Sequence, residues 1–307
     1  ISKEQKTDVQ GNDVIMTCGA AGGLNIILKA LLDPGDEVIV PAPYFVEYGF
    51  YAENHGGGLK TVPTRSDFSL DIEAMANAVG EKTKAVLINS PNNPTGQVYT
   101  EENLRDLGSI LKKKGKEMGR TLYLISDEPY RKIVFDGLTV PSIFNCYPES
   151  IITSSYSKDL SIPGERIGFV AVNPEASAKA ALLSGMTLAN RILGFVNAPA
   201  LMQRVVAELQ GVGVDASEYE RKRNLLCEGL AAGGYEFVKP LGTFYLFPRA
   251  PVPDDAAFVD VLREELILAV PGSGFGAPGY FRIAFCVSDE TIKNAMSGFK
   301  RAMERAS

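Results

Sequence analysis

The sequence has little of the chemistry on which many metalloproteins and hydrolases depend. It contains one histidine, His55, which excludes a histidine-rich metal site and leaves a single candidate for a Ser-His-Asp triad. His55 precedes three glycines in a predicted surface turn, so a structural role is favoured over a catalytic one. The four cysteines lie far apart, without a Cys-x-x-Cys spacing, and are predicted to be reduced thiols. No metal site is therefore predicted.

Long apolar runs and basic blocks are also missing. No apolar run approaches the length that spans a membrane, and the N-terminus lacks the features of a signal peptide, so a cytoplasmic location is predicted. The formal charge is -6, and no basic block is longer than Lys112–Lys114. This composition argues against nucleic acid and membranes as partners.

Strand-like and helix-like patterns alternate through about residue 173. Apolar runs at 14–17, 37–40, 84–89, 122–126 and 151–153 indicate strands, and helical spacing follows from residue 24 and over 100–118. This alternation predicts an α/β fold with a mostly parallel sheet flanked by helices.

The second half of the chain changes character. Helical patterns at 174–189, 194–209 and 216–232 are followed by short predicted strands at 235–238, 244–247, 266–270 and 280–285, with helices near 256–264 and 288–306. We predict a large α/β domain over residues 1–210, which includes the connecting helices, and a small α+β domain over residues 211–307.

Three polar features coincide with the ends of predicted strands, where α/β sheets bind ligands. Lys158 follows the run at 151–153, and Asp127 follows the run at 122–126. A buried acid needs a positive partner, although a helix cap is an alternative for Asp127. The small residues of Cys18–Gly23 stand between a strand and a helix, where backbone N–H groups bind anions. Close packing explains those small residues equally well.

Three further residues have both a structural and a functional interpretation. Asn93 lies in SPNNPTG, where two X-Pro bonds predict a stiff loop with a cis peptide or a plain turn. Phe45 follows a strand and could stack on a planar cofactor, although the stretch alone favours a core position. Arg282 interrupts an apolar strand, which suits a bound carboxylate better than a structural ion pair.

Together these residues match the needs of one cofactor. A lysine amine forms an imine with an aldehyde and can then act as acid and base, as pyridoxal phosphate (PLP) enzymes require. The chain resembles the fold type I, class I/II PLP-dependent aminotransferases of the aspartate/aromatic type. The resemblance covers essentially the whole chain and is carried, in the family's order, by GAAGG, PAPYF, NNPTG, SDEPY, SYSKDLSIPGERIG and FRIAF.

The resemblance implies a role for each of these motifs. Lys158 would form the imine and move the substrate proton, Asp127 would keep the pyridine nitrogen protonated, and Arg282 would bind the substrate carboxylate. The remaining implied cofactor contacts are Tyr130 and Asn93 with the ring hydroxyl, Phe45 with the ring face, and Ala20, Ala21, Ser155, Ser157 and Arg166 with the phosphate. Asn93 would also contact the substrate.

The resemblance further implies a homodimer with active sites at the interface, and the N-terminal segment of relatives is expected to be missing. A transaminase of aspartate or aromatic amino acids acting with a 2-oxo acid such as 2-oxoglutarate is the leading hypothesis. A PLP-dependent carbon–sulfur lyase of the cystathionine type shares the same motifs. A non-catalytic PLP-binding regulatory module is the hypothesis from another class, and the absence of a DNA-binding head disfavours it.

Overall fold

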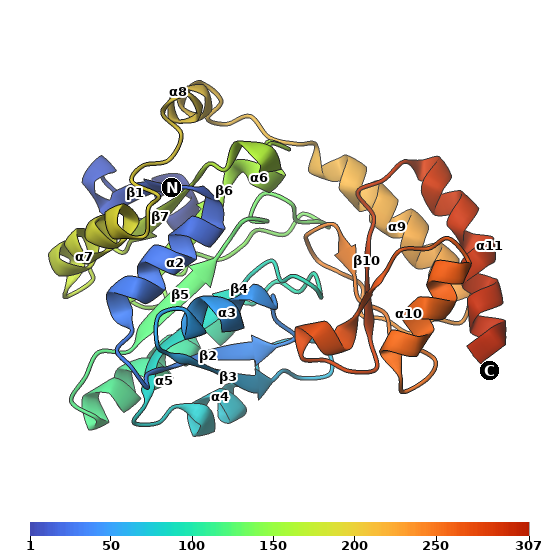
Figure 1. The fold of residues 1–307 in the computed structure, drawn as a ribbon, viewed down its shortest axis with the longest axis horizontal. Helices are drawn as coiled ribbons and strands as arrows, with labels where there is room; N and C mark the ends of the chain where they lie inside the picture. The colour runs from blue at the N-terminus through green and yellow to red at the C-terminus, as the bar shows by residue number, and fades with distance from the viewer. Residues whose placement is uncertain (307) are drawn as a thin grey trace.

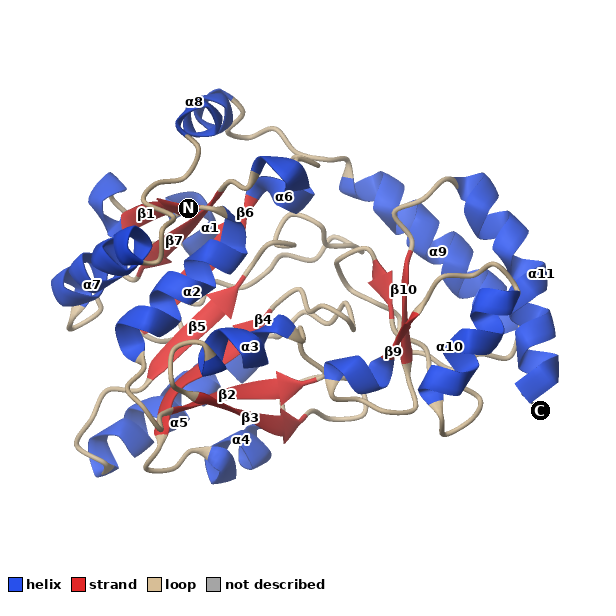
Figure 2. Ribbon diagram, in the orientation of Figure 1, coloured by secondary structure: helices blue, strands red, loops and turns tan. Residues whose placement is uncertain are grey.

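The computed structural model describes residues 1–306, which form one large and one small β-sheet (Figures 1 and 2). The large sheet has the order β1-β7-β6-β5-β4-β2-β3. Neighbouring strands from β3 to β6 run parallel, and β7 runs antiparallel to both of its neighbours. The predicted α/β fold with a mostly parallel sheet is therefore confirmed. The strands are β1 (Val14–Thr17), β2 (Glu37–Ala42), β3 (Gly58–Pro63), β4 (Thr83–Asn89), β5 (Tyr123–Asp127), β6 (Ser150–Ser155) and β7 (Gly168–Val172).

Helices cover both faces of this sheet because its strands are apolar on both sides. Val38 and Val40 of β2 pack with α2 and α7, whereas Ile39 between them packs with α4 and α5. The helices of this part are α1 (Ser2–Gln5), α2 (Gly19–Leu31), α3 (Glu47–Glu53), α4 (Ile72–Ala78), α5 (Glu101–Glu117), α6 (Tyr156–Asp159), α7 (Lys179–Ile192) and α8 (Ala200–Glu208). No helix within residues 1–306 is both long and apolar enough to cross a bilayer.

The small sheet has the antiparallel order β8-β10-β9 and packs with the last helices in a core that also includes Tyr130, Ile133 and Phe135. Its elements are α9 (Ala216–Ala232), β8 (Tyr245–Leu246), α10 (Asp255–Glu264), β9 (Val270–Pro271), β10 (Phe281–Ala284) and α11 (Asp289–Ala306). Figure 1 shows this orange and red part next to the carboxyl ends of the parallel strands. The space between the two sheets holds the candidate site.

Three strand predictions in the small sheet are wrong or too long. Residues 235–238 form no strand, only Tyr245–Leu246 of the run at 244–247 pairs, and β9 begins where the run at 266–270 ends. The run at 235–238 resembles a strand because Tyr235 is a buried aromatic residue. Its ring packs against Phe281, and its hydroxyl donates to the Phe299 carbonyl at 2.9 Å. Burial of the ring therefore gave the apolar pattern, and no strand within residues 1–306 pairs with 235–238.

Candidate active site

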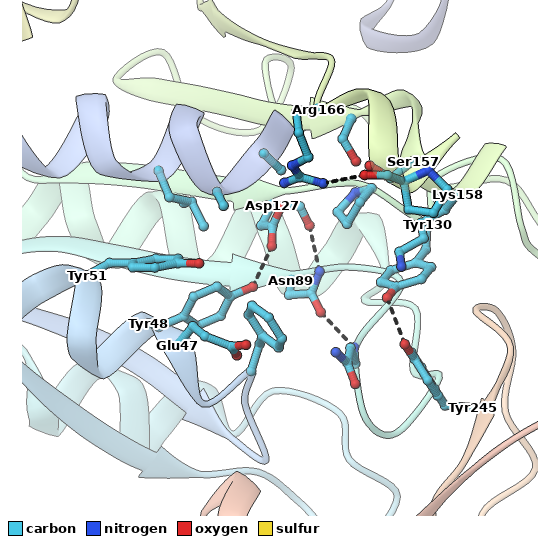
Figure 3. Close-up of a pocket in the computed structure, with 18 of the residues that line it drawn as sticks. Glu47, Tyr48, Tyr51, Asn89, Asp127, Tyr130, Ser157, Lys158, Arg166 and Tyr245 are labelled. Atoms are coloured by element: carbon cyan, nitrogen blue, oxygen red, sulfur yellow. Dashed lines mark hydrogen bonds between the residues drawn. The ribbon is translucent and has the colours of Figure 1, made fainter. Parts of the chain in front are cut away.

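A cavity of about 390 Å³ lies at the carboxyl end of the large sheet and is lined by residues of both sheets (Figure 3). All eleven residues that the sequence singles out line it, namely Ala20, Ala21, Phe45, Asn93, Asp127, Tyr130, Ser155, Ser157, Lys158, Arg166 and Arg282. They come together because the carboxyl ends of parallel strands meet at one edge of a sheet. Arg282 reaches the same cavity from β10 of the small sheet.

Asp127 is the last residue of β5 and is held from two sides. The Tyr48 hydroxyl donates to Asp127 Oδ2 at 2.6 Å, and the Asn89 amide donates to the Asp127 backbone carbonyl at 2.8 Å (Figure 3). Oδ1 is buried and has no hydrogen-bond partner among residues 1–306. Burial raises the pKa of Asp127 to about 7, although the Tyr48 hydrogen bond lowers it. A cationic N–H group in the cavity is the partner that Oδ1 needs.

Lys158 stands on the single turn α6, directly after β6. Its Nζ atom lies 5.9 Å from the centre of the Tyr130 ring and 5.5 Å from that of Phe244. Burial lowers the pKa of Lys158, and the guanidinium groups of Arg166 and Arg282 lower it further. The amine is therefore closer to its neutral, nucleophilic form than an exposed lysine.

Asn93 and Arg282 join the two sheets across the cavity. Arg282 Nη1 donates to Asn93 Oδ1 at 2.9 Å, and the guanidinium carbon lies 4.4 Å from the centre of the Tyr245 ring and 4.8 Å from that of Phe275. The predicted cis peptide in this loop is confirmed, and both Ser90-Pro91 and Asn93-Pro94 are cis. Contact with two rings leaves the planar fork of Arg282 oriented for an anion.

Tyr130 and Asn93 line the cavity with a hydroxyl and a side-chain amide. The Tyr130 hydroxyl donates to that of Tyr245 at 3.3 Å, and burial raises the pKa of Tyr130 well above its usual value, so the phenol stays protonated. The Asn93 backbone N–H donates to Asn89 Oδ1 at 2.6 Å, which fixes the residue. Its side-chain amide nitrogen makes no hydrogen bond within the part of the chain that is described, so it remains available to a ligand.

The N-terminus of α2 and Arg166 lie together at one end of the cavity. Gly19 has a φ of +71°, which strains any residue with a Cβ, and a Cβ added there would lie 2.8 Å from Arg166 Nη2, so Arg166 would have to shift. Arg166 Nη1 donates to the Pro163 carbonyl at 2.7 Å. The side-chain hydroxyls of Ser155 and Ser157, which also line the cavity, make no hydrogen bond to any residue between 1 and 306. Free backbone N–H groups, two hydroxyls and a guanidinium are a phosphate-binding set.

Sequence reasoning missed Tyr48 and Asn89, both of which hold Asp127. Asn89 carries a local signal, because it is a polar residue that ends a buried apolar run. Tyr48 carries none, because its hydrogen bond spans 79 positions and depends on how α3 packs. An aromatic residue in a helix is more often a core residue than the partner of an acid.

The cavity brings a half-buried lysine amine, an unpartnered carboxylate oxygen and two guanidinium groups together at the end of an α/β sheet, and known proteins with similar sequences show the family of the chain. The profile of the family described as "Aminotransferase class I and II" matches residues 1–299. The chain is 33% identical over 316 residues to a probable aspartate/prephenate aminotransferase of Aquifex aeolicus, covering 98% of this chain and 78% of that protein. It is 34% identical over 326 residues to an aspartate aminotransferase of Geobacillus stearothermophilus, with coverages of 99% and 79%.

Solved structures agree with these relatives. An aminotransferase from Eubacterium rectale matches with a TM-score of 0.97 and 42% identity, covering 100% of this chain and 77% of that one. The aspartate aminotransferase of Thermotoga maritima matches with a TM-score of 0.87 and 31% identity, with coverages of 99% and 79%. The chain belongs to the class I and II aminotransferase family of PLP-dependent transferases of nitrogenous groups.

The described residues fit PLP. Asp127 Oδ1 is an orphaned buried acceptor that suits a protonated pyridine nitrogen. The N-terminus of α2 with Arg166 suits a phosphate, and the lysine amine suits an aldehyde. Phe45 lines the same cavity and packs edge to face against Tyr48, with 5.5 Å between ring centres.

Proposed function

We propose that this chain binds PLP and transfers an amino group between an L-amino acid and a 2-oxo acid by a ping-pong mechanism. The observation that carries the proposal is that Lys158, with its lowered pKa, shares one cavity with the unpartnered Oδ1 of Asp127 and with Arg282. When bound, PLP supplies an aldehyde and an electron-accepting ring. The chain's own residues bind it, orient it and move the proton.

The proposed cofactor contacts follow the cavity from one end to the other. Asp127 Oδ1 accepts from the ring nitrogen, Tyr130 and the Asn93 amide donate to the ring hydroxyl, and Phe45 stacks on the ring. The backbone N–H groups of Ala20 and Ala21 bind the phosphate together with Ser155, Ser157 and Arg166. Each of these residues lines the cavity.

Lys158 and Arg282 are the proposed residues for the substrate. Arg282 binds the α-carboxylate through its planar fork, which the rings of Tyr245 and Phe275 orient. Asn93 accepts a hydrogen bond from Arg282 and contacts the same substrate. Lys158 Nζ, whose pKa burial lowers toward the neutral amine, accepts the proton from the substrate α-carbon and passes it to the aldehyde carbon of the cofactor. Burial of the amine supports this role, because a fully charged ammonium cannot accept a proton.

The proposed donor is an aspartate or aromatic amino acid, and 2-oxoglutarate is the proposed acceptor. Support comes from the names of the relatives, which include aspartate/prephenate and aspartate aminotransferases. A panel of L-amino acids with 2-oxoglutarate, followed by detection of the new 2-oxo acid and of glutamate, tests this proposal. Release of pyruvate and ammonia from cystathionine without an oxo acid would instead support a carbon–sulfur lyase. Absence of any visible absorption on adding PLP would favour the regulatory module.

We also propose that the chain acts as a homodimer. Large apolar side chains are exposed on and near α7 and α8, including Leu188 at 58%, Ile192 at 60% and Leu201 at 72%. An apolar surface of this kind is typical of an interface. Light scattering of the wild type and of Leu188→Asp tests it, and a monomeric wild type would contradict the proposal.

We further propose a large domain over residues 1–210 and a small domain over residues 211–307. Support comes from the core cluster of the small sheet, whose members lie mostly after residue 210. A cytoplasmic location is also proposed, and the four free cysteines support it.

A further inference from the structure

Lys132 and Asp159 form an ion pair next to the cavity, and the proposed reaction gives this pair no task. Lys132 Nζ donates to Asp159 Oδ2 at 2.8 Å, and the carboxylate is buried whereas the ammonium is partly exposed. Both residues line a small second cavity of about 50 Å³, which shares Pro129 and Ser155 with the first one. The pair therefore lies beside the candidate site without taking part in it.

Each partner of the pair stands close in sequence to a residue that lines the first cavity. Asp159 directly follows Lys158 on α6, and Lys132 lies two positions after Tyr130. The ladder between β5 and β6 ends before it reaches either segment. The ion pair thus joins the turn that carries Lys158 to the loop that carries Tyr130, whose ring centre lies 5.9 Å from Lys158 Nζ (Figure 3).

The turn α6 is too short to hold its shape alone. It has four residues, its N-cap makes no side-chain hydrogen bond, and isolated helices of this length are unstable. Two contacts of Asp159 hold it from outside: the side chain bonds Lys132, and the backbone carbonyl accepts from the Val214 N–H at 2.6 Å. Stability is a weak reason for the ion pair, because Asp159 Oδ1 is buried without a hydrogen-bond partner among residues 1–306. The position of the pair beside Lys158 is the better explanation.

We propose that Lys132 and Asp159 are positioning residues whose ion pair fixes the α6 turn and thereby places the Lys158 amine relative to Tyr130. This inference rests on the proposed function, because it concerns the amine that would bind PLP and move the proton. Proton transfer needs the amine within hydrogen-bond reach of the reacting carbon, and a misplacement of about 1 Å can lower a rate by about a hundredfold. The proposed carboxylate ligand Arg282 stands on β10 of the small sheet. Loss of the pair is therefore expected to lower kcat and to leave KM nearly unchanged.

The test compares Lys132→Met with Lys179→Met. Lys179 is the matched control because its Nζ lies 2.9 Å from Asp13 Oδ1, again a partly exposed lysine on a buried aspartate, and neither residue is among those that line the cavity. Both variants should unfold at lower denaturant concentration, because each leaves a buried carboxylate unpaired. Lys132→Met alone should lower kcat by about tenfold or more, with KM within about twofold.

Two measurements that do not depend on turnover accompany the kinetics. Lys132→Met, unlike Lys179→Met, should raise the dissociation constant of PLP by about fivefold or more and change the visible circular dichroism of the bound cofactor. Lys132→Arg, which keeps the charge and the hydrogen bond, should restore each value to within about threefold of the wild type.

A second set of variants keeps the inference testable if a methionine variant does not fold. Asp159→Asn removes the charge and keeps the shape, with Asp13→Asn as its control, and should lower kcat by about threefold or more. Lys132→Met/Asp159→Asn should lose no more kcat than the worse single variant, because the two residues act as one unit. Equal effects of the Lys132 and Lys179 changes, or losses that add up in the double variant, would overturn the positioning role. A wild type that binds no PLP, or that turns over no amino donor, would overturn the proposed function and this inference with it.

Discussion

Replacing Tyr48 with phenylalanine tests whether the Tyr48 hydroxyl keeps Asp127 ionised. The pKa of Asp127 is about 7, and the 2.6 Å hydrogen bond from Tyr48 lowers it against the effect of burial. A hydrogen bond to a charged group is typically worth about 1.5–3 kcal/mol, which corresponds to about one to two pKa units. At pH 7.5 the ionised fraction in the cofactor-free protein would fall from about three-quarters to about one-quarter or less.

The same change alters how stability depends on pH. Because the pKa of Asp127 in the folded chain lies above its ordinary value of 3.8, the folded state favours the protonated carboxyl. This carboxyl therefore lowers the free energy of unfolding progressively as the pH rises from about 4 to about 7. In Tyr48→Phe the decrease should continue for about one to two further pH units.

The assay is the dissociation constant of PLP between about pH 5.5 and 9.5, followed by absorbance. Affinity should rise as Asp127 ionises, and the midpoint of that rise should lie about one to two pH units higher in Tyr48→Phe. Tyr51→Phe is the matched control, because its hydroxyl belongs to the same cavity but bonds no residue of the described chain. Equal midpoints in Tyr48→Phe and Tyr51→Phe would refute the reasoning. Persistence of the transition in Asp127→Asn would show that another group titrates.

Three further changes test the remaining parts of the site. Lys158→Ala should remove the visible absorption of the bound cofactor and lower kcat by at least about a hundredfold, while the circular dichroism spectrum stays unchanged; loss of the fold would mean a structural lysine. Arg282→Lys should lower kcat/KM by about tenfold to a hundredfold through KM, because the planar fork is lost, and an unchanged KM would count against carboxylate binding. Gly19→Ala should raise the dissociation constant of PLP more than tenfold, because the new Cβ displaces Arg166. Gly35→Ala is the control: Gly35 has a φ of +91° with open space around it, so this change should lower the stability of the fold and leave PLP binding unchanged.

Much of the site could be predicted from the sequence because its residues stand at strand ends. Lys158, Asp127 and Asn93 each follow an apolar run, and the order of strands and helices already predicts that such ends meet at one edge. The short strands of the small sheet were harder, since β8 and β9 contain two residues each and depend on pairing with β10. The apolar run at 235–238 shows the limit, because a buried pattern does not say whether a partner strand exists.

The sequence by itself determined the α/β order, the lysine after β6, the acid after β5 and the arginine within an apolar strand, because each is a local pattern of residue types. Only the tertiary structure decided which groups meet across long separations. Tyr48 reaches Asp127 and Arg282 reaches Asn93 through contacts that no spacing encodes. Likewise, only the packing of α3 leaves one oxygen of Glu47 buried without a partner. Local chemistry therefore indicated a PLP site, whereas the ionisation of its acid depends on tertiary contacts.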